Sequence, residues 1–268
     1  MSHFGPHGLA RPLLLRRGRR DPIVLDVDGT VCFDGGTIAE EIALALDELA
    51  DRGHPIVFAS ARPVRDLAPV LAERFPDAGR IGANGALWAD QDDVATLTRF
   101  SADDRAVLEA EFAAFNARYL VDGPWDFAYT GPEDHPLRSR VNRLGQAQKL
   151  RLDDLELIVK ALSLSSRNQD ALATRLDAAG LTVHRHHGED LVDVSPGASD
   201  KWSALDTLGV PEGGYIAFGN DANDVSLLAH AALGVRVGHH SALDDVADRT
   251  VAADAGAVAA QLRALARD

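Results

Sequence analysis

Short apolar runs that end in polar residues open the chain. Residues 21–28 read Asp-Pro-Ile-Val-Leu-Asp-Val-Asp, and residues 55–59 form a second apolar run that ends at Ser60. Runs of this kind are typical of buried strands in a parallel sheet, with polar groups at the carboxyl end. We therefore predict a parallel strand over each segment.

A helical pattern follows each of these predicted strands. Thr37 and Glu40 have the spacing of a capping box, and Gly53 ends the apolar periodicity that they open. Pro63 is placed to begin a second helix, which extends to about residue 74. The alternation of strands and helices predicts an α/β fold with a Rossmann-like, doubly wound parallel sheet.

The pattern changes in the middle of the chain. Residues 86–89 and 155–161 have the character of half-covered strands, and Ser101 and Asn168 are placed to cap helices. A sheet with one covered face and helices on one side is typical of a separate α+β module. The predicted domains are a flexible basic arm over 1–20, a core made of 21–84 and 194–268, and an inserted module over 85–193.

The first pattern returns after the insertion. A helix is expected after Asp200, a strand over 215–218, and another helix after the polar segment 219–224. The last predicted strand covers 235–238, and most of 251–266 is expected to be helical. In open parallel sheets, ligands bind beyond the carboxyl ends of the strands, so the polar strand ends are expected to converge there.

Two carboxylates mark the end of the first strand. Asp26 and Asp28 lie two residues apart on an extended chain, so both begin on the same face. They repel each other unless a cation or a shared proton relieves them, and a hard divalent cation with oxygen ligands would do so. An Asp-Gly pair alone is typical of a turn. The full string from Asp26 to Thr30 after a buried strand favours a functional site.

Composition narrows the class of protein. The chain has 268 residues, 46% of them hydrophobic, which is enough for one large or two smaller domains. No apolar run approaches the ~20 residues that span a bilayer. The single cysteine, Cys32, excludes an intramolecular disulfide framework and a cysteine-based zinc site. We expect a cytoplasmic location by default.

Charge argues against two classes of partner. A formal net charge of −14 gives no general attraction for nucleic acid or an anionic membrane. The exception is the start of the chain, which we interpret as a solvated tail or, less simply, as an arm that contacts phosphates. Its basic residues are Arg11, Arg16, Arg17, Arg19 and Arg20.

Lysine is scarce in this chain. Only Lys149, Lys160 and Lys201 stand among 27 basic residues. Lys201 falls in the first turn of a predicted helix, where a cation opposes the helix dipole at a cost of about 0.3–1 kcal/mol. A bound phosphate at that helix end would compensate, although a solvated surface lysine is the simpler alternative.

Together these motifs resemble those of the haloacid dehalogenase-like hydrolase (HAD) superfamily. Residues 26–30 resemble its first motif, Ser60 its second, Lys201 its third and residues 219–224 its acidic fourth, all in the right order. The insertion between the second and third motifs resembles the cap of the Cof-type sugar-phosphatase branch. The segments that border it, 84–86 and 193–196, resemble that branch too.

The resemblance implies a magnesium-dependent phosphatase that acts on a small phosphorylated metabolite, most plausibly a sugar phosphate. Asp26 would attack phosphorus, and Asp28 would protonate the leaving alcohol. Ser60 and Lys201 would bind the transferring phosphoryl group. The implied metal ligands are Asp26, Asp28, Asn220, Asp221 and Asp224, and the implied substrate contacts are Gly29, Thr30, Ser60, Ala61, Arg62, Lys201 and Asn223.

Several alternatives stay open at this stage. The superfamily usually has Asp where this chain has Asn220, so either Asn220 or Asp221 would be the direct metal ligand, and a non-catalytic phosphometabolite-binding protein is conceivable. A phosphosugar mutase would use the same aspartyl-phosphate. Arg62 would contact a phosphate or pair with a nearby acid. The histidines at 184, 186 and 187 indicate a polar cap face more readily than a metal site.

Overall fold

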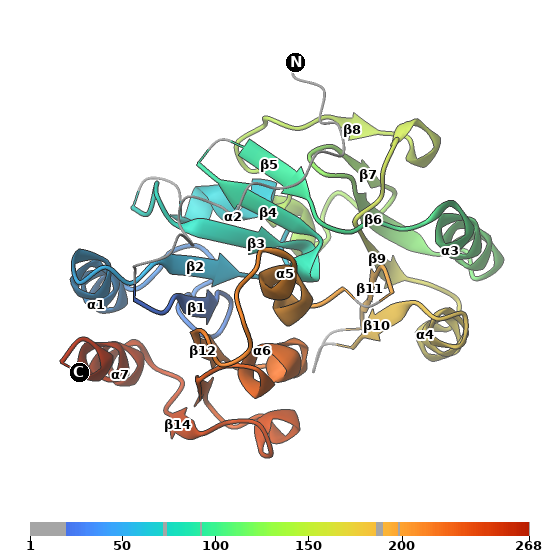
Figure 1. Cartoon of the computed structure of the whole chain (residues 1–268). Helices are drawn as coiled ribbons and strands as arrows, with labels where there is room; N and C mark the ends of the chain where they lie inside the picture. The colour runs from blue at the N-terminus through green and yellow to red at the C-terminus, as the bar shows by residue number, and fades with distance from the viewer. Residues whose placement is uncertain (1–19, 72–73, 92, 186–189, 198, 268) are drawn as a thin grey trace.

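Two sheets organise the molecule (Figure 1). The computed structural model describes residues 20–71, 74–91, 93–185, 190–197 and 199–267. Neighbouring strands of the first sheet pair in parallel except at one end, where the last two pairings are antiparallel. Its order is β14 (Arg249–Val251), β13 (Leu233–Val237), β12 (Ile216–Gly219), β1 (Ile23–Asp26), β2 (Ile56–Ala59), β3 (Gly79–Gly82), β4 (Leu87–Asp90) and β5 (Asp93–Thr96).

Helices cover both faces of this sheet, which confirms the doubly wound α/β fold. Helices α1 (Glu40–Asp51) and α7 (Ala255–Leu265) lie side by side and pack on one face, together with apolar side chains of α2 (Val64–Leu71). Helices α5 (Lys201–Thr207) and α6 (Val225–Ala229) pack on the other. The apolar side chains of β1 and β2 alternate between the two clusters, as buried strands require.

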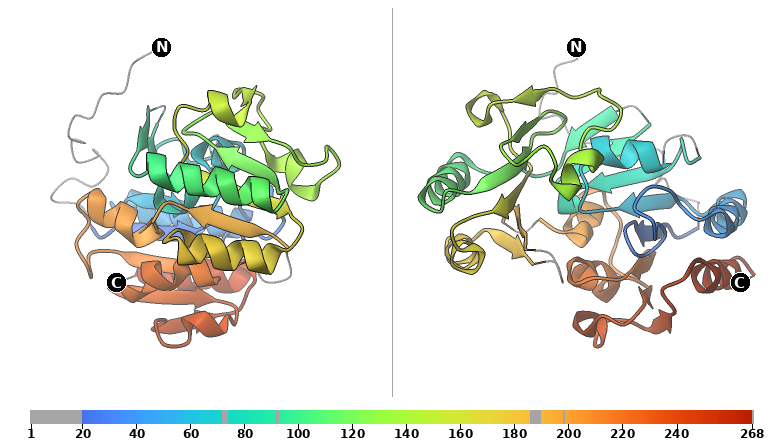
Figure 2. Two further views of the ribbon diagram at one scale, coloured as in Figure 1. Left: turned by 90° about the vertical axis from the view of Figure 1, so that its right-hand side faces the viewer. Right: turned by 180° about the vertical axis from the view of Figure 1, so that it is seen from behind.

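The second sheet has helices on one face only. Helices α3 (Ala102–Ala114) and α4 (Gln169–Ala178) lie side by side there, as both views in Figure 2 show, and Ser101 and Asn168 cap them as predicted. The other face turns toward the carboxyl ends of the first sheet's strands. The strand order is β10 (Thr182–His184), β11 (Val192–Ser195), β9 (Lys160–Ser165), β6 (Arg118–Asp122), β7 (Phe127–Tyr129) and β8 (Lys149–Leu150).

The two sheets divide the chain later than residue 85. The hairpin of β4 and β5 pairs with β3 and so extends the first sheet. The second sheet begins with β6 and ends with β11. The α+β character of the insertion is confirmed, whereas the boundaries of the cap domain at 85 and 193 stay a prediction.

Three local predictions were wrong. Helix α1 begins at Glu40 without a side-chain cap, because the Thr37 amide and hydroxyl both donate to the carboxylate of Asp34 in the preceding turn. Residues 155–159 lie outside the strands, since β9 starts only at Lys160. Strand β14 was missed because three residues at a sheet edge carry no clear alternation.

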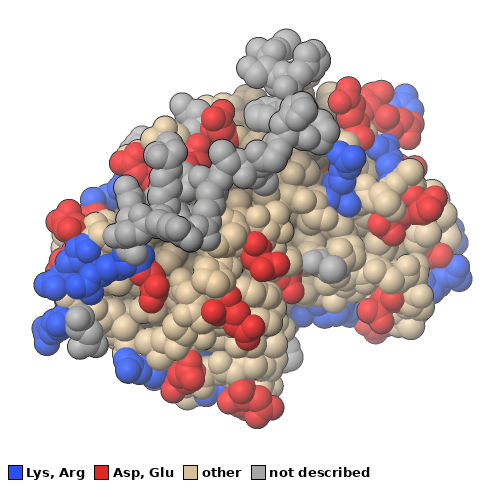
Figure 3. All heavy atoms as spheres, viewed as in Figure 1, with Lys and Arg blue, Asp and Glu red and all other residues tan. Residues whose placement is uncertain are grey.

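None of the helices in the described part of the chain combines the length and apolar character that crossing a bilayer requires. Acidic and basic side chains share the face seen in Figure 3. Residues 1–19 of the basic arm lie outside the described residues. The cytoplasmic location and the absence of nucleic-acid binding remain predictions.

Helix α1 offers a matched test of the first core. Leu46 is fully buried beneath the helix, whereas Leu44 is 46% exposed. Leu46→Ala is expected to lower the free energy of unfolding by about 3 kcal/mol through lost burial and an unfilled cavity. Leu44→Ala is expected to change it by less than about 0.5 kcal/mol. Urea unfolding followed by circular dichroism checks both, and equal losses would contradict this packing.

Candidate active site

Three adjacent strands bring their polar ends together. The order β12-β1-β2 places the ends of these strands at one edge of the sheet, as the sequence predicted. A cavity of about 410 Å³ lies there, between the first sheet and the second. Its lining includes Asp26, Asp28, Ser60, Ala61, Arg62, Asn220, Asp221 and Asn223 from the core, and Leu120, Asp122, Leu137, Arg140, Val141, Lys160, Leu162, Leu191 and Asp193 from the inserted segment.

A buried ammonium stands at the centre of the site. Lys201 Nζ lies 2.6 Å from Asp26 Oδ1 and 2.5 Å from Asp224 Oδ1, and its side chain is 1% exposed. Lys201 reaches this place because Asp200 caps helix α5, accepting a hydrogen bond from the Ser203 amide. A solvated surface lysine, the simpler alternative, is therefore wrong.

Within the buried triad of Asp26, Lys201 and Asp224, the pKa values of Asp26 and Lys201 are shifted. Burial raises the pKa of Asp26 to about 7, against the attraction of Lys201, and Asp224 and Asp28 raise it further. Burial lowers the pKa of Lys201, but the carboxylates of Asp224 and Asp26 outweigh it and hold the pKa above its ordinary value. Two carboxylates share one ammonium, so the triad carries an excess of negative charge.

Asp224 shapes the loop after β12. Its Oδ2 accepts the backbone amides of Asn220 and Asp221 at 2.9 and 3.1 Å, while its Oδ1 is bound to Lys201. Both oxygens of this buried carboxylate therefore have partners within the protein. Asp221 Oδ1 accepts from the Ala222 amide at 2.7 Å and lies 3.2 Å from His240 Nε2.

The side-chain tip of Asn220 lies among oxygen atoms. One tip atom is 3.1 Å from each of Thr30 Oγ1, Asp26 Oδ2 and the Asp28 carbonyl oxygen. With its nitrogen there, the amide donates to these oxygens. With its oxygen there, the Asn220 oxygen, Asp26 Oδ2 and the Asp28 carbonyl oxygen form a group of three possible metal ligands, and none of the three donates a proton to another. Gly29 is required beneath this tip, since a Cβ there would lie 2.3 Å from Asn220 Nδ2.

Asp28 is more open to solvent than Asp26. Its side chain is 44% exposed, compared with 7% for Asp26. Arg62 binds both of its oxygens, through Nη2 and through Nε at 2.7 Å. The open alternative for Arg62 is thus resolved in favour of an acidic partner in this structure.

A single peptide unit carries the contacts beside Ser60. Ser60 is buried, and its Oγ accepts the backbone amide of Arg62 at 3.1 Å. The carbonyl of the same peptide unit belongs to Ala61, which also lines the cavity.

Asn223, which lines the same cavity, contacts the segment after β3. Its Nδ2 lies 3.4 Å from Asn84 Oδ1, so the loop after β12 is tied to that segment.

Side chains from the inserted segment were missed by sequence reasoning. Asp122, Lys160 and Asp193 are all less than 5% exposed, and the first two end and begin strands of the second sheet. Only the scarcity of lysine gave any signal for Lys160. Arg65 of α2 donates to Asp122 at 2.7 Å, and burial raises the pKa of Asp122. Charged groups therefore link the two sheets beneath the cavity.

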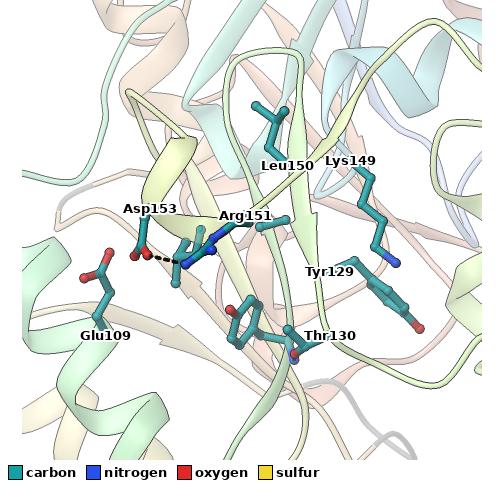
Figure 4. Close-up of a pocket in the computed structure, with 10 residues that line it drawn as sticks. Glu109, Tyr129, Thr130, Lys149, Leu150, Arg151 and Asp153 are labelled. Carbon is teal, nitrogen blue, oxygen red and sulfur yellow. Dashed lines mark hydrogen bonds and ion pairs between the residues drawn. The ribbon is translucent and has the colours of Figure 1, made fainter.

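A second cavity, of about 560 Å³, lies against the inserted segment (Figure 4). Its charges are exposed and paired: Lys149 with Glu133 at 3.2 Å and Arg151 with Asp153 at 3.3 Å. Surface pairs of this kind contribute little free energy and activate no nucleophile. We assign the chemistry to the cavity between the two sheets, because Asp26 of the triad lines it and no member of the triad lines the second cavity.

The histidines of the inserted segment remain unassigned. His184 lies on strand β10 and is half-buried. His186 and His187 lie outside the described residues. Among the described residues, no three side chains of His, Cys, Asp or Glu are grouped to hold a metal by themselves.

Comparisons with known proteins agree with this geometry. The family model described as haloacid dehalogenase-like hydrolase matches residues 23–259. The 5-amino-6-(5-phospho-D-ribitylamino)uracil phosphatase YitU of Bacillus subtilis is 25% identical over 250 residues, which cover 86% of this chain and 91% of that protein.

Solved structures share the fold. The sugar phosphatase BT4131, of HAD subclass IIB, matches with a TM-score of 0.74 and 17% identity over 91% of this chain and 98% of its own. The phosphatase BT1666 from Bacteroides thetaiotaomicron matches with a TM-score of 0.73 and 21% identity over 94% and 98%.

The triad makes a prediction about stability. Lys201→Met leaves two buried carboxylates without their cation, and we expect it to lower the free energy of unfolding by about 3 kcal/mol at neutral pH. The loss should be larger at pH 8 than at pH 5.5. Without Lys201, the pKa of Asp26 in the folded protein rises further, because the attraction that lowered it is lost. A carboxyl with a raised pKa in the folded state lowers the free energy of unfolding as pH rises toward that pKa.

Urea unfolding of the metal-free protein at both pH values measures this loss. Lys149→Met, which removes an exposed lysine from strand β8, is the control and should change little. A loss for Lys201→Met that is independent of pH would contradict the burial of two ionisable carboxylates at this ammonium.

Proposed function

Because this chain belongs to the haloacid dehalogenase-like hydrolases, we propose that it is a magnesium-dependent phosphatase that hydrolyses a small phosphate monoester through an aspartyl-phosphate. One observation carries the proposal. The buried Asp26 carboxylate is held by Lys201 through one oxygen, while its other oxygen lies at the Asn220 tip and the cavity. A carboxylate fixed in this way is positioned for nucleophilic attack.

The reaction has two steps. An oxygen of Asp26 bonds to phosphorus while the bond from phosphorus to the leaving oxygen breaks, and Asp28 gives that oxygen a proton. Asp28 then takes a proton from water, whose oxygen bonds to phosphorus and releases Asp26. Lys201 and the Ser60 hydroxyl, whose oxygen accepts from the Arg62 amide, stabilise negative charge on the phosphoryl oxygens.

Asp28 acts as an acid only when an oxygen is free to hold the proton. In this structure Arg62 binds both of its oxygens. The role therefore requires Arg62 to release at least one oxygen, and a phosphate in the cavity offers the guanidinium a second anion. Arg62 thus serves the reaction through two successive partners.

Asp26, the Asp28 carbonyl and the Asn220 side chain suit a magnesium ion. Octahedral bonds of 2.0–2.1 Å place neighbouring ligand oxygens about 2.9 Å apart, close to the 3.1 Å between the Asn220 tip and each of the two other groups. We assign Asn220 as the direct ligand of its loop, with Asp224 orienting the loop. The ion would offset phosphate charge and polarise the phosphoryl group.

The cavity suits a small leaving group with an apolar portion. Residues 60–62, which we name the phosphate-binding loop, share the cavity with aliphatic side chains of the second sheet and the segments beside it: Leu120, Leu137, Val141, Leu162 and Leu191. A relative of this chain bears the name of a phosphatase for a ribityl phosphate, and a fold neighbour is titled a sugar phosphatase. We propose a sugar or sugar-alcohol phosphate as the substrate.

Removal of the nucleophile tests the reaction. Asp26→Asn is expected to abolish release of inorganic phosphate from a panel of sugar phosphates, because the amide is nearly isosteric but does not attack phosphorus. Unfolding in urea should remain cooperative. Retained turnover would show that another group is the nucleophile.

The same assay separates the two rival functions. Isomerised sugar phosphate without release of inorganic phosphate would indicate a mutase, and no change in any compound of the panel would favour a binding protein.

The loop after β12 predicts an effect on metal affinity. EDTA should stop phosphate release, and added magnesium should restore it. Asn220→Asp adds a charge at the ligand position, so we expect half-maximal rate at roughly tenfold lower magnesium. Asp221→Asn should leave that concentration within about twofold, because Asp221 faces His240. The opposite ranking would make Asp221 the ligand.

A further inference from the structure

Lys160, another of the three lysines, contacts the phosphate-binding loop from the second sheet. Lys160, the first residue of β9, lies in the inserted segment and lines the cavity. Its Nζ donates to the Ala61 carbonyl at 2.6 Å and forms an ion pair with Asp193 at 2.8 Å. The side chain of Lys160 is 5% exposed and that of Asp193 is inaccessible.

The peptide unit between Ala61 and Arg62 joins Lys160 to Ser60. Its carbonyl oxygen accepts from Lys160, and its N–H, on Arg62, donates to Ser60 Oγ at 3.1 Å. In a trans peptide the C=O and N–H point in opposite directions. The ammonium and the hydroxyl therefore lie at opposite edges of this peptide unit.

This arrangement has both a geometric and an electrostatic effect. A charge-assisted hydrogen bond to the carbonyl fixes the rotation of the peptide plane, and so fixes the direction of the Arg62 N–H. It also polarises the peptide and strengthens that N–H as a donor, since hydrogen bonds in a chain reinforce one another where the dielectric is low. Both effects act on the Ser60 hydroxyl, which is proposed to bind a phosphoryl oxygen and whose oxygen accepts from this N–H.

The Asp193 ion pair alone does not account for this contact. Asp193 already satisfies the charge of Lys160, and a buried pair is weak support for a fold, because desolvation of both ions opposes their attraction. The bond to Ala61 is an additional contact between segments far apart in the sequence. Its position beside Ser60 gives it a use that packing does not supply.

We propose that Lys160 is a positioning residue through which the inserted segment orients the phosphate-binding loop. The Ala61–Arg62 peptide has its catalytic orientation only when Lys160 lies against it. The inserted segment then contributes to the chemical step as well as to enclosure of the substrate. The proposal rests on the phosphatase function proposed above.

Two variants isolate the hydrogen bond to Ala61. Asp193→Asn removes the ion pair but keeps the Lys160 donor. Lys160→Met combined with Asp193→Asn removes the donor as well, without leaving a buried carboxylate unpaired. With p-nitrophenyl phosphate and magnesium, the double variant is expected to have at least about tenfold lower kcat than Asp193→Asn, about 1.4 kcal/mol in the barrier, with KM within about threefold.

Lys149→Met, on strand β8 of the same sheet, is the control for a lysine away from the loop, and its kcat should be unchanged. Equal kcat values for Asp193→Asn and the double variant, both folded by urea unfolding, would overturn the proposal. Absence of turnover in the unmutated protein would overturn the phosphatase function instead.

A measurement that needs no turnover tests the role of Lys160 even if the unmutated protein has no activity or the double variant does not fold. Lys160→Arg keeps a cation beside Asp193 but moves the donor relative to the Ala61 carbonyl. The amide resonance of Arg62 in a ¹⁵N–¹H spectrum is expected to shift in Lys160→Arg and to stay in place in Lys149→Met. An unmoved Arg62 resonance in Lys160→Arg would show that the peptide does not sense the lysine.

Discussion

The ammonium of Lys201, enclosed between two carboxylates, is the constraint on which the rest of the site depends. It joins the end of β1, the start of α5 and the loop after β12, which are far apart in the sequence. Because Asp224 also holds two backbone amides of its loop, one cation fixes both the nucleophile and the presentation of Asn220. The negative charge left over is what a bound magnesium ion and the adjacent basic groups would balance.

The inserted segment is coupled to the core by buried charged groups. Removing one partner would leave the other charge buried without a partner, which costs free energy. Arg65 reaches Asp122, and Lys160 reaches the Ala61 carbonyl. Asp122, Lys160 and Ala61 all line the cavity, so these contacts join the inserted segment to the core at the candidate site itself.

The sequence was most informative where the physics is local or strongly periodic. Apolar runs predicted β1 and β2, and parallel strands necessarily bring their polar ends to one edge. Sequence reasoning could not choose between Asn220 and Asp221, because the backbone of their loop is held by hydrogen bonds to Asp224 and the Asp221 side chain lies beside His240. Nor could it pair Arg62 with Asp28 or Lys160 with Ala61, since both contacts depend on tertiary geometry.

The shared use of Arg62 has a consequence for how the enzyme idles. The guanidinium holds both oxygens of Asp28. In the proposed mechanism, Asp28 therefore cannot act as the proton donor until substrate binds. A phosphate dianion that binds in the cavity would be the reactant and would also draw Arg62 away from Asp28, so that Asp28 could donate its proton. In the proposed mechanism, an uncharged sugar of similar shape would occupy the cavity without releasing Asp28 from Arg62. Discrimination against uncharged sugars would therefore begin before any bond is broken.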